Sequence, residues 1–354
     1  MSARPAALVL CAAACLLAAG CSSGYVVRAA YEEARLLWRR QPIDRVLAGD
    51  IDPETRAKLQ LTLAVRRFAK ENLGLAVRGS YTSLAAVEPS QIVHVVTAAP
   101  QDQLVPYTWW FPIVGRVPYR GYFDAAAADA FAADLQRQGY DTYVRPTVAF
   151  STLGWFDDPL LSTLLKYDEE RLAETIIHEF LHNTIYVPGQ TAFNESFATF
   201  VGYHGAEAFF IADDQPARAR RTAARWADTL TYSEFLAQLV AELQAAYASG
   251  VRGADRDALF DRARAEFAAQ RWQTHEYSGF TREPLNNAVV LHDRLYAERL
   301  DMFERAYARN GDDLKTAVAW IRDRVEDHSD PFAALENALG TYQASPNAAA
   351  PPRG

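Results

Sequence analysis

The segment His178-Glu179-Phe180-Leu181-His182 contains the residue types that a catalytic zinc site requires. It lies in an apolar, helix-forming stretch, where positions i and i+4 project side chains from adjacent turns on one face. His178 and His182 can therefore share one metal ion, while Glu179 points slightly aside and can reach a water molecule at the metal. Zinc lowers the pKa of such a water to roughly 7, so Glu179 can accept its proton as the water attacks a carbonyl.

A catalytic zinc ion keeps three protein ligands and one open position. We expect Glu195, within residues 193–198, to be the third ligand. Pro188 and Gly189 can reverse the chain between two helices, and an antiparallel hairpin would place the start of the second helix beside the end of the first. The alternative is a structural stripe of polar residues without a metal, which is less favoured because unpaired buried His and Glu side chains are costly.

Hydrolysis at such a site needs a hydrogen-bond donor for the charge that develops on the carbonyl oxygen. The candidate donors, each of which could instead be a packing or surface residue, are Tyr186, Tyr203, His204, His292 and Tyr296. Residues 148–152 are expected to form either a substrate-binding edge strand or an ordinary buried strand. Asp157 and Asp158 could bind a substrate ammonium group, although capping a helix that begins at Pro159 is the favoured role.

The elements that position these residues fall into two parts. Residues 25–75 are expected to be helical, and strands are predicted at 92–96, 108–114, 140–144 and 147–151, with a helix between Asp124 and Gly139. From Asp158 onward the pattern is helical, with segments predicted at 170–186, 191–210, 216–249, 254–271, 284–308, 311–325 and 330–342.

The N-terminus has the features of a lipoprotein signal peptide over residues 1–20. A single charge, Arg4, precedes an apolar run that ends in Ala18-Ala19-Gly20-Cys21, which resembles a bacterial lipobox with Cys21 as the lipidation site. A plain secretory signal with an incidental cysteine is the alternative. Ser22, rather than Asp, after the cysteine favours the outer membrane. The other cysteines, Cys11 and Cys15, leave with the signal, so no disulfide is expected in the mature chain.

Composition limits the classes of partner. Apolar residues make up 50% of the chain and charged residues 23%, which is typical of a globular protein rather than a disordered one. The net charge of −8 argues against nucleic acid as a partner, because phosphate binding needs a basic face.

The histidine motif followed by Asn194-Glu195 resembles the glutamate-zincin metallopeptidases. Residues 151–159 and 191–201 are more closely similar to the bacterial predicted-aminopeptidase lipoproteins, and this resemblance extends over roughly 25–340. It implies a zinc aminopeptidase in which His178, His182 and Glu195 bind zinc and Glu179 is the base. Thermolysin-like enzymes carry an Asp one turn after the ligand Glu to support a zinc histidine. Thr199 stands there in this chain, so that support must come from elsewhere.

We therefore predict an α+β, zincin-like fold, with a small mixed β-sheet in the N-terminal half, a zinc-binding helix and a mainly helical C-terminal half. Residues 21–343 are expected to form a single metallopeptidase unit. Its α/β portion spans 25–158 and its helical portion, with the zinc site, spans 159–343. Residues 344–354 are expected to be a disordered tail.

The predicted function is a metallopeptidase with one Zn²⁺ per chain, acting as an aminopeptidase on peptide or protein substrates. Cys21 would anchor it to the membrane at the periplasmic face of the outer membrane, in the bacterial cell envelope. One alternative is an envelope endopeptidase or quality-control protease. The other is a catalytically silent, lipid-anchored binding module.

Overall fold

A computed structural model of the chain describes residues 38–87, 92–111, 115–147, 157–275, 277, 280 and 285–340. The predictions for the signal peptide, Cys21, the tail after residue 343 and the strand at 148–152 therefore lie outside the described residues. Within the described part of the chain, none of the helices combines the length and apolar character needed to cross a bilayer.

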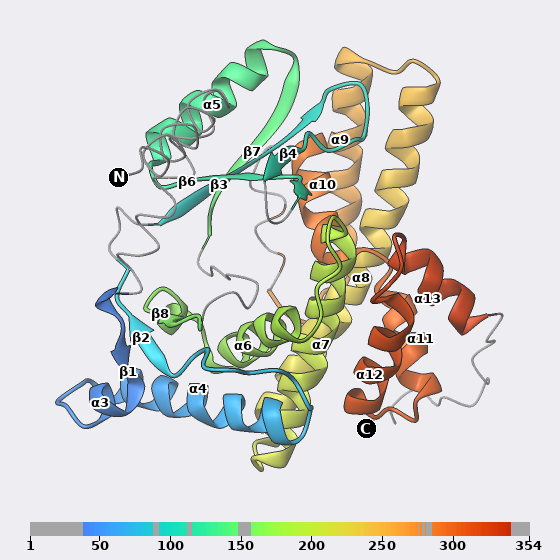
Figure 1. Cartoon of the computed structure of the whole chain (residues 1–354). Coiled ribbons are helices and arrows are strands. Elements are labelled where there is room, and N and C mark those ends of the chain that lie inside the picture. Colours follow the sequence, from blue (N-terminus) through green and yellow to red (C-terminus); the bar gives the residue numbers. More distant parts are fainter. Residues whose placement is uncertain are drawn as a thin grey trace, which may run out of the picture.

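The predicted α+β class is confirmed: short strands and a few helices precede a long helical half (Figure 1). The strands are β1 (Gln41–Pro42), β2 (Ser83–Ala85), β3 (Val93–Pro100), β4 (Trp109–Phe111), β5 (Gly115–Val117), β6 (Arg120–Tyr122), β7 (Tyr140–Thr147) and β8 (Leu160–Leu161). The helices are α3 (Ile43–Leu47), α4 (Pro53–Glu71), α5 (Ala125–Arg137), the 3-10 turn η3 (Leu164–Lys166), α6 (Glu169–Thr184), α7 (Thr191–Ala212), α8 (Pro216–Ala248), α9 (Gly253–Ala269), α10 (Asn287–Ala297), α11 (Leu300–Arg309), α12 (Leu314–Val325) and α13 (Pro331–Leu339).

The described strands form three small sheets rather than one mixed sheet, in the orders β1-β2-β8, β6-β3-β7 and β4-β5. Parallel pairing occurs between β2 and β8, and the other strand pairs are antiparallel. The sheets bury different surfaces. Leu160 of β8 belongs to the main core with α4 and α6, whereas Val96 of β3 packs with Ala128 and Ala132 of α5 in a separate cluster.

Strand β7 runs unbroken from Tyr140 to Thr147, where two strands were predicted. Pro146 is tolerated because β7 pairs only with β3 and forms an edge of its sheet, so the missing N–H of proline is not needed on the open side. Side chains alternate along β7. Val144 packs on the α5 face, so Tyr143 and Arg145 point to the opposite face, where Tyr143 meets His292 of α10.

The helix predicted at 284–308 is wrong, because α10 ends at Ala297 and α11 begins at Leu300. Arg299 has a left-handed backbone with φ of 54°, which interrupts the helix. Ser196 donates to the carbonyl of Leu295 and accepts from the backbone N–H of Glu298, both at 2.9 Å. Ser233 donates to the carbonyl of Ala297 at 2.6 Å. Buried hydroxyls on α7 and α8 thus form hydrogen bonds with the backbone C=O and N–H groups that the helix break leaves without helical partners.

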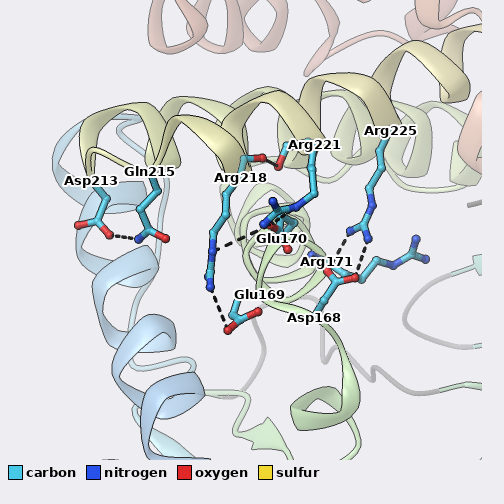
Figure 2. A network of polar contacts seen from close by, with 10 residues as sticks. Asp168, Glu169, Glu170, Arg171, Asp213, Gln215, Arg218, Arg221 and Arg225 are labelled. Carbon is cyan, nitrogen blue, oxygen red and sulfur yellow. Dashed lines mark hydrogen bonds and ion pairs between the residues drawn. The ribbon is translucent and has the colours of Figure 1, made fainter. Parts of the chain in front are cut away.

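The N-terminus of α6 is tied to α8 by charge pairs (Figure 2). Asp168 caps α6 by accepting from the backbone N–H of Arg171 at 2.8 Å and pairs with Arg225 at 2.6 Å. The remaining pairs join the next two acids of α6 to the same face of α8, Glu169 with Arg218 and Glu170 with Arg221. The hydrogen bond from Arg225 lowers the pKa of Asp168 to about 2. Acids at this end also complement the helix dipole.

Two glycines allow α7 to lie directly against α6. A Cβ at Gly202 would approach the carbonyl oxygen of Glu174 to 3.0 Å and Cβ of His178 to 3.3 Å. A Cβ at Gly205 would approach Cγ2 of Ile177 to 2.8 Å. Cγ2 belongs to a β-branched side chain whose rotamer is restricted, so it cannot swing away easily. The spacing of α6 and α7 therefore depends on these two positions.

Replacing Gly205 with Ala should lower the free energy of unfolding by about 1–2 kcal/mol, because overpacking outweighs the higher helix propensity of Ala. Denaturant unfolding measures the change. In an Ile177→Ala background the closest contact is removed and only the flexible end of Leu73, at 3.0 Å, remains, so the two substitutions together should cost less than the sum of the single effects. A Gly205→Ala protein as stable as the wild type would contradict the close approach.

Candidate metal centre

The hairpin between α6 and α7 is fixed by the side chain of Asn194. Its Oδ1 accepts from the backbone N–H of Val187 at 2.9 Å, and its Nδ2 donates to the carbonyl of the same residue at 2.8 Å. Gly189, with φ of 75°, occupies the turn between the helices. Asn194 is buried and lies in the first turn of α7, so this pair of bonds sets where the next residue, Glu195, points.

His178, His182 and Glu195 converge, as predicted from the hairpin. The Nε2 atoms of the two histidines lie 3.2 Å apart. Oε2 of Glu195 lies 3.2 Å from Nε2 of His178 and 3.5 Å from Nε2 of His182. Both imidazoles are buried. Among the described residues, these three form a group that can hold a metal ion.

The spacing and the donor types fit zinc. Two imidazole nitrogens and a carboxylate oxygen form a common catalytic zinc set. Metal–ligand bonds of about 2.0–2.2 Å in a tetrahedron require donor atoms about 3.3–3.6 Å apart. The three separations, 3.2 to 3.5 Å, lie within about 0.1 Å of that range. Three neighbouring protein ligands also leave a fourth position for water or a substrate oxygen.

The cluster has a strong electrostatic signature without a cation. Burial lowers the pKa of the His178 imidazole, but the hydrogen bond and charge of Glu195 outweigh burial and raise that pKa to about 9. Burial raises the pKa of the Glu195 carboxyl, whereas the charges and hydrogen bonds of the two histidines hold it well below its usual range. A proton on His178 therefore supplies part of the positive charge that a bound metal ion would bring.

Glu179, the predicted base, projects beside the cluster rather than into it. Its carboxylate is half-buried, and its Oε2 is a buried oxygen without a hydrogen-bond partner in the described structure. Its negative charge nevertheless raises the pKa of His178 and of Tyr296, which places it in the same electrostatic environment. A buried carboxylate oxygen with no protein donor is suited to accept a proton from a bound water.

The predicted support for the histidines is not found in the described part of the chain. Nδ1 of His182 is buried and has no partner there, and the neighbouring Asn183 has an unpartnered Oδ1. Thr199, one turn after Glu195, is buried on α7.

The five predicted donors separate into two groups. The first group lies near the metal cluster and consists of Tyr186, His292 and Tyr296. The ring of Tyr296 stacks on that of His178 with 6.3 Å between centroids, and the ring of His292 lies 5.6 Å from that of Tyr296. Burial and the charge of Glu195 raise the pKa of Tyr186. Tyr186 follows α6, which ends at Thr184, rather than lying on it.

Tyr203 and His204 belong to other parts of the structure. Nε2 of His204 lies 2.7 Å from Glu304 of α11, which also accepts from Trp226 at 2.8 Å. Tyr203 packs against Trp226 at 5.5 Å between ring centroids. These two residues of α7 are therefore core residues and not part of the site.

The proposed cap at Asp157 and Asp158 is wrong in detail, because Pro159 leads into strand β8 and not into a helix. The carboxylate of Asp157 accepts from the backbone N–H of Gly79 at 2.9 Å, and the backbone N–H of Asp158 meets the hydroxyl of Ser80 at 3.1 Å. Asp157 thus holds the loop that precedes β2 through its carboxylate, and Asp158 holds it through its backbone.

Sequence reasoning missed two residues near the cluster, Tyr119 and Arg145. The pKa of Tyr119 is raised by burial and by the charge of Glu195. Nη2 of Arg145 lies 3.5 Å from the hydroxyl of Tyr296. Tyr119 lies beside Arg120 in a short aromatic block that could have attracted attention, but nothing in the sequence around Arg145 marks it.

Zinc affinity should rise with pH, since zinc must displace the proton held by His178. Below pH 9 the apparent association constant should increase about tenfold per pH unit, because one proton is released per ion bound. Competition with a chromogenic chelator between pH 6.5 and 8.5 measures it. Glu195→Gln should weaken binding and flatten this slope, because the carboxylate that raises the His178 pKa is gone. A pH-independent affinity in the wild type would contradict the assignment.

Comparison with known proteins gives one result. Neither the curated proteins nor the solved structures searched contain a match to this chain. A family model described as "Putative aminopeptidase" matches residues 24–330, which is most of the chain and includes the metal cluster and α10. This match agrees with the resemblance found in the sequence. The chain belongs to the family described as "Putative aminopeptidase".

Proposed function

We propose that this protein is a zinc-dependent metallopeptidase. The observation that carries the proposal is the convergence of His178, His182 and Glu195 at tetrahedral-edge distances. A carboxylate with an unpartnered oxygen, Glu179, lies beside them. Membership of a peptidase family supports the same conclusion independently of the geometry.

A bound zinc ion would supply Lewis-acid polarisation of the substrate carbonyl and would acidify an attacking water. In this proposal Glu179 orients that water, takes its proton and delivers the proton to the departing amine nitrogen. The environment suits this role because Oε2 of Glu179 makes no protein hydrogen bond that would compete for the proton.

Tyr296 is the best-placed donor for the developing oxyanion. Burial and the charge of Glu195 raise the pKa of its hydroxyl, so the O–H remains protonated over the physiological range. Burial and the charge of Arg145 lower the pKa of His292 well below its usual value, so that ring is neutral and can donate only one N–H. Both residues lie on α10, opposite the zinc-binding helix.

The family description favours an aminopeptidase over an endopeptidase or a silent binding module. The Glu179 carboxylate and a complete ligand triad argue against the silent module, because a chain that had lost catalysis would have no need to keep both. The position of the scissile bond relative to the chain ends then decides between the two peptidase types.

Glu179→Gln should retain stoichiometric zinc and lower kcat for a tripeptide by a factor on the order of 10² or more, because the amide cannot accept the proton. Metal analysis and steady-state kinetics measure the two effects. Glu169→Gln, in the first turn of the same helix and directed to Arg218 rather than to the metal cluster, serves as the control and should keep both zinc and activity. Full hydrolysis by a zinc-loaded Glu179→Gln protein would sink the mechanism.

Comparing peptides with free and acetylated N-termini in the same assay tests the aminopeptidase assignment. An aminopeptidase should lose activity on the acetylated peptide, whereas an endopeptidase should cleave both at similar rates. A chain that neither binds zinc nor responds to added zinc would favour the binding module.

We also propose that Cys21 is lipidated and anchors the protein at the periplasmic face of the outer membrane. The support is the run of small residues Ala18-Ala19-Gly20 before the cysteine and Ser22 after it. Cys21→Ser should move the protein from the membrane fraction to the soluble fraction of a bacterial host and abolish incorporation of a labelled fatty acid. Unchanged membrane association and labelling would refute the anchor.

A further inference from the structure

Arg145 is a half-buried cation without a carboxylate partner. Among the described residues, its buried Nε has no hydrogen-bond acceptor, and the hydrogen bond that the guanidinium makes there is a long one, from Nη2 to the hydroxyl of Tyr296 at 3.5 Å. No Asp or Glu among the described residues forms an ion pair with it. Removing a guanidinium from water without a counter-charge is costly, so this arrangement implies an anionic group that arrives from outside the chain.

Several other buried or partly buried arginines of the described structure pair with a carboxylate, and Arg56 and Arg66 donate to backbone carbonyls. The side chain of Arg256 is buried and contacts the carboxylate of Asp141. Arg264 and Arg305 also have a buried Nε without an acceptor, yet Arg264 reaches Asp261 at 3.6 Å and Arg305 reaches Glu336 at 3.2 Å. Arg145 differs from these arginines because, among the described residues, it has neither a carboxylate partner nor a backbone acceptor, only the long contact with the Tyr296 hydroxyl.

The guanidinium lies beside the metal centre. Arg145 is on β7, at the edge of its sheet, on the face that looks towards α10. Its contact residue Tyr296 stacks on the ring of His178 with 6.3 Å between centroids.

We propose that Arg145 binds the free α-carboxylate of a short peptide whose scissile bond lies at the metal centre. This inference rests on the proposed peptidase function and names its substrate class. A guanidinium fork matches a carboxylate with two parallel hydrogen bonds. A carboxylate one or two residues beyond the scissile carbonyl lies about 4–8 Å away, since consecutive Cα atoms are about 3.8 Å apart. Dipeptides and tripeptides meet this requirement.

The acidic groups near the site do not favour recognition of an ammonium group instead. The carboxylate of Asp157 accepts from the backbone N–H of Gly79, and the backbone of Asp158 bonds to Ser80 and Tyr81 in the same loop before β2. Asp293, which follows His292 on α10, accepts a hydrogen bond from Tyr232. Of the charged groups named in this comparison, Arg145 is the one whose counter-charge the described residues do not supply.

The test compares Ala-Phe-Ala with its C-terminal amide on the zinc-loaded enzyme. Wild type should cleave the free acid with a kcat/KM on the order of 10² above that of the amide, the effect of one charge-assisted bidentate contact. Arg145→Gln should lower the value for the free acid to that for the amide and leave the amide unchanged. Arg145→Lys should restore part of the preference. Arg137→Gln, an exposed residue of α5, should match the wild type.

Binding gives a second readout that does not require turnover. In a Glu179→Gln background, calorimetry should detect binding of the peptide with a free C-terminus but not of its amide. Adding Arg145→Gln should abolish this difference in binding. If no peptide is hydrolysed but this difference remains, the proposed function fails and the role of Arg145 stands.

Three results would overturn the inference. The first is a wild type that cleaves acid and amide equally well while hydrolysing both. The second is an Arg145→Gln protein that loses both substrates in parallel, which would assign Arg145 to positioning Tyr296. The third is Arg145-dependent cleavage of Ala-Glu-Ala amide at the same rate as Ala-Phe-Ala with a free C-terminus, which would show that Arg145 binds a side-chain carboxylate.

Discussion

The candidate site depends on the close contact between α6 and α7. A metal cluster shared by two helices requires their backbones to approach so that short side chains can meet, and Gly202 and Gly205 provide this by having no Cβ. Gly202 lies directly against Glu174 and His178, so the glycine that brings the helices together does so at the first ligand. Asn194 then fixes the hairpin at its closed end, which leaves Glu195 little freedom.

The opposite wall is held by a different set of interactions. Asn287, at the start of α10, donates from its backbone to Asp141 at 2.9 Å and from its side chain to the carbonyl of Pro100 at 2.8 Å, while Tyr247 donates to its Oδ1 at 2.7 Å. Because these partners come from the β3–β7 sheet and from α8, α10 is tied to both layers. The break after α10, satisfied by Ser196 and Ser233, lets the chain turn away after Tyr296.

The electrostatics of the site follow from bringing these layers together. Two histidines and a glutamate on one side face a neutral histidine, tyrosine hydroxyls and an unpaired arginine on the other. Elsewhere the fold neutralises its charges, as in the pairs between α6 and α8 (Figure 2). Glu179, His182 and Arg145, each with a buried polar atom that lacks a partner among the described residues, lie at or near the cluster, where a metal ion and a substrate would supply partners.

The sequence by itself determined the local features: the motif on α6, the hairpin and the α+β class. These follow from helical periodicity, capping and turn residues, which act over a few neighbouring positions. Only the tertiary structure decided which tyrosines and histidines face the metal, that the helix predicted at 284–308 breaks at Arg299, and that Arg145 lies beside Tyr296. Arg145 and Tyr296 are 151 positions apart. Their contact depends on how a strand and a helix pack through distant partners, and no periodicity in the sequence encodes that.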